Sequence, residues 1–401
     1  MPGFTQGLCG TSISPEDYKW PLRVALAFDS FKGSLSASEA CDSVFTALIS
    51  TFGDRVHVSR YPMADGGEGS ISLLRSLDGF VHRRAKASDA LGRDITVEYL
   101  LSDSGTVAHI ETARACGLPG VADLPAQPLL ATSAGVGTLI EDALDAGVDE
   151  IVLYLGGSAC TDGGVGLLSS LGMRFLDRNG DALPPGGGAL ASLEIIDMDG
   201  LHSRAADTRW TLVTDVDAVL TGPKGAAHVF GPQKGADQAD VAALDFGLTR
   251  LAKVAKRSGL SGIGSQAGSG AAGGMGALAV PLFNARIVPG ALHFMGITGL
   301  SRALSNTDVV LTGEGRFDSQ SLTGKVAGTV ASLARAATSP VAVAVLAGSV
   351  DRITPSDNRL SSFSISPGPS KLDDLQEHAG DLLSSLAVSV IQLALDVRSV
   401  D

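Results

Sequence analysis

Three short stretches of the chain place acidic residues among glycines: Ala64–Gly69, Gly156–Gly164 and Thr312–Asp318. Each follows an apolar segment typical of a strand, and each leads toward a segment typical of a helix. Glycines there let a ligand approach the backbone closely, and the start of a helix offers free N–H groups to an anion. Carboxylates suit Mg²⁺, which binds one or two of them together with phosphate oxygens. The three stretches together indicate an enzyme of phosphoryl transfer.

The lysines support a phosphate-binding role. The sequence has nine lysines, and four of them adjoin a glycine: Lys32, Lys224, Lys234 and Lys325. A flexible ammonium group beside open backbone can bind phosphate as a point charge. Because glycine is abundant, one or two such pairs are expected without any function. Lys32 and Lys325 are the strongest candidates, since each lies between an expected strand and an expected helix.

Five acidic residues come just after expected strands: Asp65, Asp162, Asp215, Glu314 and Asp318. An acid beside glycine ordinarily caps a helix or forms an Asx-turn. Ligands of open α/β sheets, however, bind outside the carboxyl ends of the strands. Phosphoryl transfer also needs a group that accepts the proton of the acceptor hydroxyl. The shared position of these acids therefore favours a site.

Familiar nucleotide signatures do not fit. The Gly324-Lys325 pair lacks the spacing of a P-loop. The segment Gly268–Gly273 matches GxGxxG, but no convincing strand precedes it and the acid expected about 20 residues later is missing. The protein-kinase motifs HRD and DFG are missing as well. The sequence therefore argues against these three classes of nucleotide site.

Composition limits the partners and the compartment. The net charge is −13, whereas nucleic acids and anionic membranes require a cationic surface. The four cysteines are far apart, which is typical of reduced cytosolic thiols. No stretch resembles a signal peptide or approaches the ~20 apolar residues of a membrane span. We expect a cytoplasmic protein that binds small molecules and neither nucleic acid nor membrane. The sequence does not decide whether the protein forms a homo-oligomer.

Two domains are expected, because 401 residues exceed the size of a single core. Residues 1–19 are polar and aperiodic and predict a flexible leader. Strands alternate with helices in 20–75 and again in 295–401, which predicts one α/β domain made from both ends of the chain. The residues between them, 76–294, begin with a β-rich stretch and predict an inserted second α/β domain.

Hydrophobic periodicity predicts the individual elements. The expected strands are 22–28, 56–61, 151–155, 210–214, 308–311 and 341–346, with an antiparallel stretch at 80–111. The expected helices are 40–49, 134–146, about 321–336 and about 382–397. Ser36 and Glu39 have the spacing of a capping box ahead of the first helix.

Eight sets of residues, in one consistent order, resemble the bacterial glycerate kinase family that uses ATP and D-glycerate. They are 27–36, 64–69, 156–158 with 162–164, 220–223 with 225–226, 230–236, 270–276, 312–316 with 318–320 and 324–325, and 367–369. Together they span roughly 23–397, which makes the resemblance more specific than any single motif.

The resemblance implies two α/β domains, one of them Rossmann-like or flavodoxin-like, with the active site in the interdomain cleft. It also implies transfer of the γ-phosphoryl group of ATP to a hydroxyl of D-glycerate, with 2-phosphoglycerate favoured over 3-phosphoglycerate.

The roles of the site residues are our own inferences from residue type and position. Asp65 or Asp215 is the expected base, and Lys32 and Lys325 are expected to neutralise phosphate charge. Glu314 and Asp318 are expected near Mg²⁺, and Arg316 is expected to hold the glycerate carboxylate in a bidentate pair. The remaining candidates for substrate or phosphate binding are Ser30, Gly66, Gly67, Gly156, Gly157, Ser158 and Lys234.

Two positions depart from the family pattern. Ala218-Val219 stand where the family commonly has Asn-Pro, and Cys160-Thr161 stand where it often has Thr-Asn. The departures leave open a kinase of another small hydroxy or sugar acid. A non-catalytic regulator that binds a small ligand on the same scaffold is the non-enzyme alternative.

Overall fold

The computed structural model describes residues 21–319, 321–322, 325–337, 339, 341–351 and 360–398. They form two compact units. The first unit takes residues 21–62, 299–319 and the described residues from 330 onward, and the second takes Met63–Thr298 with the described part of 320–329. The expectation of two α/β domains is confirmed. The expected leader, 1–19, lies outside the described residues.

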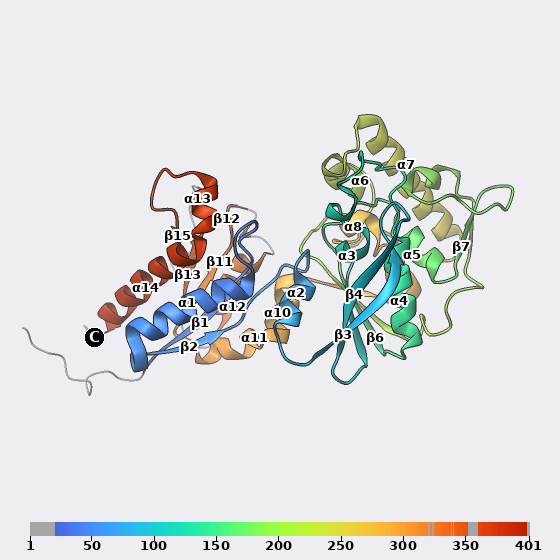
Figure 1. Cartoon of the computed structure of the whole chain (residues 1–401). Helices are drawn as coiled ribbons and strands as arrows, with labels where there is room; N and C mark the ends of the chain where they lie inside the picture. Colours follow the sequence, from blue (N-terminus) through green and yellow to red (C-terminus); the bar gives the residue numbers. More distant parts are fainter. Residues whose placement is uncertain are drawn as a thin grey trace, which may run out of the picture. The chain divides into compact units, whose positions relative to one another are not determined.

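A parallel sheet of five strands forms the centre of the first unit, in the order β15-β13-β11-β1-β2 (Figure 1). Read from β2, this is the order 2-1-3-4-5 of flavodoxin-like folds, as the resemblance implies. The order changes direction between β1 and β11, which makes this pair the topological switch point. The strands are β1 (Leu22–Phe28), β2 (Val56–Arg60), β11 (Val309–Gly313), β13 (Ala342–Ala347) and β15 (Leu360–Ser364), with a small pair, β12 (Arg316–Phe317) and β14 (Ser349–Val350).

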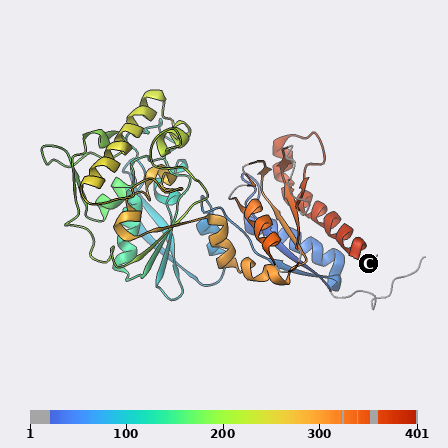
Figure 2. The same cartoon turned by 180° about the vertical axis from the view of Figure 1, so that it is seen from behind.

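Helices cover both faces of this sheet. Helices α1 (Ala37–Phe52) and α14 (Ala379–Arg398) lie side by side on one face, and α12 (Val326–Ala336) covers the other (Figure 1, Figure 2). The alternation of β1 explains the packing, because Leu26 and Phe28 join the core under α1 and α14. Shorter elements are α11 (Leu300–Ala303), α13 (Leu372–Glu377) and the 3₁₀ turns Gly53–Arg55 and Leu304–Asn306.

The predicted capping box begins α1. The Ser36 hydroxyl accepts the Glu39 N–H at 3.2 Å, and the Glu39 carboxylate accepts the Ser36 N–H at 2.8 Å. The reciprocal pair satisfies two backbone donors that a helix start otherwise leaves open. It orients α1 directly after the loop that follows β1.

Helix α14 is long and apolar enough to cross a membrane by length and composition. The prediction that no apolar stretch approaches this length is therefore wrong for 379–398. The physical reason is that a helix packed on a sheet also needs an apolar stripe: Leu383, Ala387 and Ile391 of α14 lie in the core with β1 and α1. The absence of a membrane partner stays a prediction.

A mixed sheet of six strands forms the centre of the second unit, in the order β10-β9-β6-β5-β4-β3. The four strands from β10 to β5 are parallel, and β4 and β3 are antiparallel, which confirms the expected antiparallel stretch. The strands are β3 (Phe80–Ser88), β4 (Asp94–Ser102), β5 (Val107–Glu111), β6 (Glu150–Tyr154), β9 (Arg209–Val213) and β10 (Arg286–Val288), with a separate pair, β7 (Arg174–Leu176) and β8 (Ile195–Asp197).

The helices of the second unit are mostly short. They are α2 (Ser70–Arg75), α3 (Ala113–Cys116), α4 (Ala134–Asp145), α5 (Val165–Ser170), α6 (Ala226–Phe230), α7 (Gln238–Arg257), α8 (Ala271–Gly274), α9 (Ala279–Phe283) and α10 (Gly290–Thr298), with 3₁₀ turns at Pro119–Val121, Gly187–Ser192 and Pro232–Lys234. Helix α4 packs against β3, β5 and α5, and α7 packs against the Gly187–Ser192 turn. Trp210 of β9 stacks on Phe283 with ring centroids 4.5 Å apart.

Helix α2 and the last turn of α10 separate the observed units from the expected domains. The units divide after Pro62 and after Thr298, whereas the sequence placed the boundaries after 75 and after 294. Helix α2 packs on β4 and β5 through its apolar side, with Ile71 and Leu74 buried. Helix α10 likewise continues from β10. Both helices follow strand-like segments, so periodicity alone cannot say which sheet they cover.

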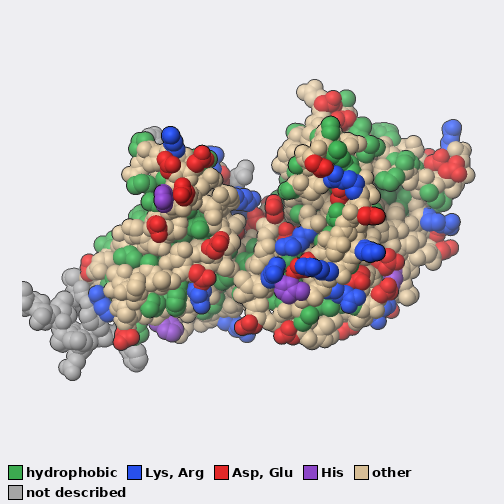
Figure 3. Space-filling model, viewed as in Figure 1, with side chains coloured by type: hydrophobic (Ala, Val, Ile, Leu, Met, Phe, Trp, Pro, Cys, Tyr) green, Lys and Arg blue, Asp and Glu red, His purple; other side chains and the backbone are tan. Residues whose placement is uncertain are grey.

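Acidic and basic side chains are interspersed on the face of the molecule in view in Figure 3. Several basic side chains lie close together over the second unit, with acidic side chains between and around them. A mixture of both signs is typical of a solvated surface.

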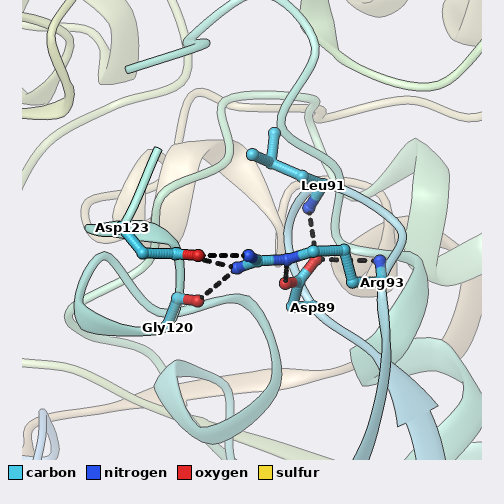
Figure 4. Close-up of polar contacts among 5 residues, drawn as sticks. All are labelled: Asp89, Leu91, Arg93, Gly120 and Asp123. Atoms are coloured by element: carbon cyan, nitrogen blue, oxygen red, sulfur yellow. Dashed lines mark hydrogen bonds and ion pairs between the residues drawn. The ribbon is translucent and has the colours of Figure 1, made fainter. Parts of the chain in front are cut away.

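Arg93 ties the β3–β4 turn to the loop after α3 (Figure 4). Its guanidinium donates to Asp123 at 2.6 Å and to the Gly120 carbonyl at 2.7 Å, and it also pairs with Asp89. Asp89 is buried and accepts the N–H groups of Leu91 and Arg93 at 2.8 and 3.0 Å. The cluster connects two segments that share no sheet hydrogen bonds.

We expect Arg93→Met to lower the melting temperature by a few degrees, because it leaves the buried Asp89 carboxylate without its cation. The matched control is Arg84→Met, an exposed position on β3. Thermal unfolding followed by circular dichroism measures both variants. Equal melting temperatures for the two would contradict a structural role for the Arg93 cluster.

Candidate active site

Three predicted loops meet at the carboxyl end of the parallel strands in the second unit. Gly156 follows β6, Asp215 follows β9, and Asp65 lies in the stretch before α2. A methyl group on Gly156 would lie 2.6 Å from the Gly67 Cα, so these two loops are in contact. The Asp65 carboxylate is near enough to Asp215 to influence its ionisation. The structure thus brings these predicted residues into one cluster.

Gly66 and Gly290 allow this close approach. Gly66 has φ +82°, a conformation that favours glycine, and its Cβ position would lie 2.7 Å from the Val213 side chain. A Cβ on Gly290 would lie 2.0 Å from the Asp65 carbonyl oxygen. Sequence reasoning missed Gly290 because it missed the short strand β10. The available signal was the Pro289-Gly290 pair that follows an apolar segment.

Asp215 combines one satisfied oxygen with one orphaned oxygen. Its Oδ1 accepts the Gly290 N–H at 2.6 Å, whereas its Oδ2 is buried and has no hydrogen-bond partner among the described residues. Burial, followed by the like charge of Asp65, raises the pKa of Asp215 to about 7. A role for Asp215 as the cap of α10 explains the hydrogen bond of Oδ1 and leaves Oδ2 unexplained. A carboxylate of this kind can exchange a proton near neutral pH.

Glu111 is a site residue that sequence reasoning missed. It ends β5, is buried, and accepts the N–H groups of Gly69 and Ile71 at 3.1 and 2.9 Å. These bonds hold the first acidic stretch against the sheet edge. Burial raises the pKa of Glu111, which the two N–H groups and Arg114 oppose. The rule that selected Asp215, an acid at the carboxyl end of a strand, could also have found it.

Asp162 of the second acidic stretch is buried, and its carboxylate accepts hydrogen bonds from neighbouring loops. It accepts the Ser133 N–H at 2.8 Å, the Ser133 hydroxyl at 2.9 Å, and the N–H groups of Gly164 and Gly166 at 3.1 and 3.2 Å. Its side chain is 1% exposed. The ordinary capping role therefore describes Asp162, which joins the loop before α5 to the loop before α4.

Lys234 is also turned inward. Its ammonium group donates to the Cys160 carbonyl at 2.6 Å and to the Ser158 hydroxyl at 3.2 Å, and the residue is buried. Burial lowers the pKa of Lys234. In this structure Lys234 and Ser158 bind each other and fix the loop that continues from Gly156 and Gly157. Their roles in phosphate binding stay predictions.

A second group of predicted residues lies at the switch point of the first unit. Ser30 and Lys32 follow β1, and Glu314 follows β11. The Asp29 N–H donates to the Gly313 carbonyl at 2.9 Å, which joins the two loops. Lys32 is exposed, so its ammonium group is available to a ligand at the end of the sheet. This is where flavodoxin-like sheets bind ligands.

Arg316 pairs with acids of its own unit. Its guanidinium lies 2.9 Å from Asp351 and 3.9 Å from Asp318. The expected pair between Arg316 and a substrate carboxylate would have to replace the Asp351 contact. Its role stays a prediction.

Lys325 lies immediately before α12 and is half-buried. Lys325 belongs to the second compact unit, whereas Lys32 belongs to the first. The two predicted phosphate-binding lysines therefore come from different units.

The described residues contain no group of three or more His, Cys, Asp and Glu side chains arranged to hold a metal ion. Mg²⁺ needs only one or two carboxylates when phosphate oxygens and water complete its shell. The carboxylates of Glu314 and Asp318, both half-buried beside the switch point, are hard oxygen donors of this kind. The donor set fits Mg²⁺ bound together with a nucleotide.

The glycerate kinase family model matches residues 24–395, nearly the whole chain. The chain belongs to the glycerate kinase family. It is 38% identical over 371 residues to a glycerate kinase from Bacillus subtilis (strain 168), covering 91% of this chain and 96% of the relative. It is also 38% identical over 320 residues to a glycerate 2-kinase from Escherichia coli (strain K12), covering 80% and 84%.

A solved structure supports the same assignment. A protein from Salmonella typhimurium LT2, described as a glycerate kinase 2, superposes with a TM-score of 0.77 at 33% identity. The match covers 94% of this chain and 100% of the other. Membership of the glycerate kinase family makes the protein an enzyme and a kinase, in agreement with the phosphoryl transfer that the acidic glycine stretches indicate.

Asp215→Asn tests the raised pKa of Asp215 through stability. In the unfolded chain an aspartate ionises near pH 4, whereas in the folded protein Asp215 ionises at about pH 7. Folding therefore favours the protonated form, and Asp215 lowers stability progressively as the pH rises from about 4 to 7. We expect the asparagine variant to melt higher than the wild type at pH 8, with the difference vanishing near pH 4.

The matched control is Asp199→Asn, an exposed acid of the same unit that does not influence the pKa of Asp215. Melting temperatures are measured across this pH range for the three proteins. A constant difference between Asp215→Asn and wild type at every pH would show that Asp215 ionises normally.

Proposed function

We propose that the protein phosphorylates D-glycerate with ATP and forms 2-phosphoglycerate. The observation that carries this proposal is the match of the glycerate kinase family to residues 24–395. Curated relatives named glycerate kinase align with most of the chain, and one of them is named a glycerate 2-kinase. Beyond the family, we propose the acceptor, the product and the roles of the site residues.

Asp215 is the proposed general base. A base must bind a proton during the reaction, and its orphaned Oδ2 atom offers an acceptor with no competing donor among the described residues. A pKa of about 7 places its proton exchange in the physiological range. Asp65 is the proposed partner, because its negative charge helps to raise that pKa. The contacts of Asp215 therefore favour it over Asp65 as the base.

The reaction step follows from these roles. A glycerate hydroxyl oxygen attacks the γ-phosphorus of ATP, and its proton passes to the Asp215 carboxylate. The new O–P bond forms while the bond between the γ-phosphorus and the bridging oxygen breaks, and ADP leaves with the electron pair. The close-packed glycine loops, Gly66-Gly67 and Gly156-Gly157, would limit the room around the reacting hydroxyl.

Charge neutralisation is the second requirement of phosphoryl transfer. Lys32 and Lys325 are the proposed cations, and Ser30 is the proposed hydroxyl donor to a phosphate oxygen. Glu314 and Asp318 would hold Mg²⁺, which supplies charge neutralisation of the phosphates when bound. The interdomain cleft stays a prediction of the resemblance, and the cytoplasmic location stays a prediction from composition.

A kinase of another small hydroxy acid is the second candidate. Ala218-Val219 depart from the family pattern and lie in the loop that continues from Asp215. The Ala218 carbonyl accepts the Gly270 N–H at 2.8 Å, which packs this loop against the Gly268–Gly273 segment. A change of shape here would alter the acceptor while leaving Asp215 in place.

The direct test incubates the full-length protein with Mg-ATP and D-glycerate and identifies the product by phosphorus NMR. We expect 2-phosphoglycerate together with equimolar ADP. A panel of small hydroxy acids measured in parallel separates glycerate from other acceptors. Turnover of another acid with none of glycerate would move the proposal to the second candidate, and 3-phosphoglycerate would overturn the regiochemistry.

Asp215→Asn tests the proposed base. We expect kcat to fall by roughly 10²–10⁴-fold, the range typical of a lost general base, while ADP affinity stays near that of wild type. The wild-type kcat/KM for glycerate should fall as the pH drops below about 7, where Asp215 becomes protonated. Asp199→Asn serves as the control, and a variant of Asp215 with a near-normal kcat would contradict the assignment.

A further inference from the structure

A cavity of about 450 Å³ opens in the first unit, beside the switch point. It begins at Lys32 and Ser34 after β1 and at Gly315 after β11. It continues past Gly348 and Ser349 after β13 to Ile365 after β15. All of these segments follow the carboxyl ends of parallel strands. The cavity therefore occupies the edge where open α/β sheets bind their ligands.

The walls of the cavity are apolar. Phe31, Val350, Ile365, Leu372 and Leu375 line it, and Ala379 of α14 adds a small buried surface. A few polar groups are distributed among them, chiefly serine hydroxyls and the Gln376 amide. Apolar walls with a few polar groups are typical of sites for aromatic ligands of moderate size. A three-carbon acid such as glycerate is too small and too polar to fill this space.

The charge of the cavity is concentrated at one end. Among its described lining residues, Lys32 is the single charged side chain, and the lining holds no carboxylate. A Cβ on Gly33, which follows Lys32, would lie 2.8 Å from the Gln376 side chain. Helix α13 thus lies against the Lys32 loop. The Gly315 Cβ position would lie 3.6 Å from the backbone nitrogen of Lys32, so the loop after β11 borders the same end.

We infer that this cavity binds the adenosine end of the nucleotide. The adenine ring lies among the apolar side chains from Val350 to Leu375, the serine and glutamine groups meet its polar edge and the ribose, and the phosphate chain leaves past Lys32 and Gly315. The inference rests on the proposed function only in naming an adenine nucleotide. It assigns nucleotide binding to the first unit and leaves Asp65 and Asp215 of the second unit for the acceptor.

Ser349→Phe tests the assignment by filling the cavity. Ser349 is an exposed residue of β14 that lines the cavity, so a phenylalanine there competes with the base for space. The matched control is Ser361→Phe, an exposed serine of β15 outside the lining. Isothermal titration calorimetry of the full-length proteins with ADP measures binding without catalysis. We expect Ser349→Phe to weaken ADP at least tenfold and Ser361→Phe to leave it unchanged.

Two further measurements identify the moiety that is bound. AMP should displace ADP from the wild type, whereas inorganic tripolyphosphate at the same concentration should not, because the cavity recognises adenosine. In steady-state kinetics the KM for ATP should rise in Ser349→Phe while the KM for glycerate stays constant. Equal ADP affinity in Ser349→Phe and wild type, or a selective loss of glycerate affinity, would overturn the inference.

Circular dichroism establishes that each variant folds. Ser364→Phe, at a second lining position on the same strand as the control, replaces Ser349→Phe if the latter does not fold. The outcomes separate this inference from the proposed function. ADP binding that is lost in the cavity variants, in a protein that does not phosphorylate glycerate, would refute the function and retain the nucleotide site.

Discussion

The hydrogen bond from the Gly290 N–H group to Asp215, 2.6 Å long, connects the parts of the second unit that hold the proposed base and its acidic neighbour. It joins the end of β9 to the start of α10, and the same glycine contacts the Asp65 backbone. Because this contact requires the absence of a side chain, the approach of the two acids depends on backbone geometry. Burial then follows from the approach, and the raised pKa of Asp215 follows from burial together with the neighbouring Asp65 charge.

The two sheets place different chemistry at the same topological position. In each unit the functional candidates follow the carboxyl ends of parallel strands, but the second unit presents a pair of acids in glycine loops whereas the first presents Lys32 beside an apolar cavity. Phosphoryl transfer needs both a proton acceptor and a site for a large anionic nucleotide. We propose that the inserted unit holds the proton acceptor and that the other unit binds the nucleotide.

The strand β1, the capping box of α1 and the flavodoxin-like first unit could be predicted, because each rests on local periodicity or on the family resemblance. Asp65 and Asp215 could be predicted from their positions after apolar strands. Their ranking could not, because the surroundings of the Asp215 carboxylate include Gly290, which is 75 residues away in sequence and binds only its Oδ1 atom. The cavity was also beyond sequence reasoning, since its walls come from four strand ends and from α13, and the short strand β15 gives little periodic signal.

The acids that follow apolar strands look alike in sequence, but Asp162 and Asp215 differ in the number of hydrogen-bond donors that each meets. Asp162 accepts four hydrogen bonds shorter than 3.3 Å from Ser133, Gly164 and Gly166, so a proton or a ligand would have to displace structural partners. Asp215 accepts one hydrogen bond, from the Gly290 N–H group, and its Oδ2 atom has no hydrogen-bond partner among the described residues. Buried polar atoms are normally satisfied, and an exception at a sheet edge is costly to the fold. An unsatisfied Oδ2 atom of Asp215 at this sheet edge is understandable if a substrate hydroxyl donates a hydrogen bond to it during each catalytic cycle.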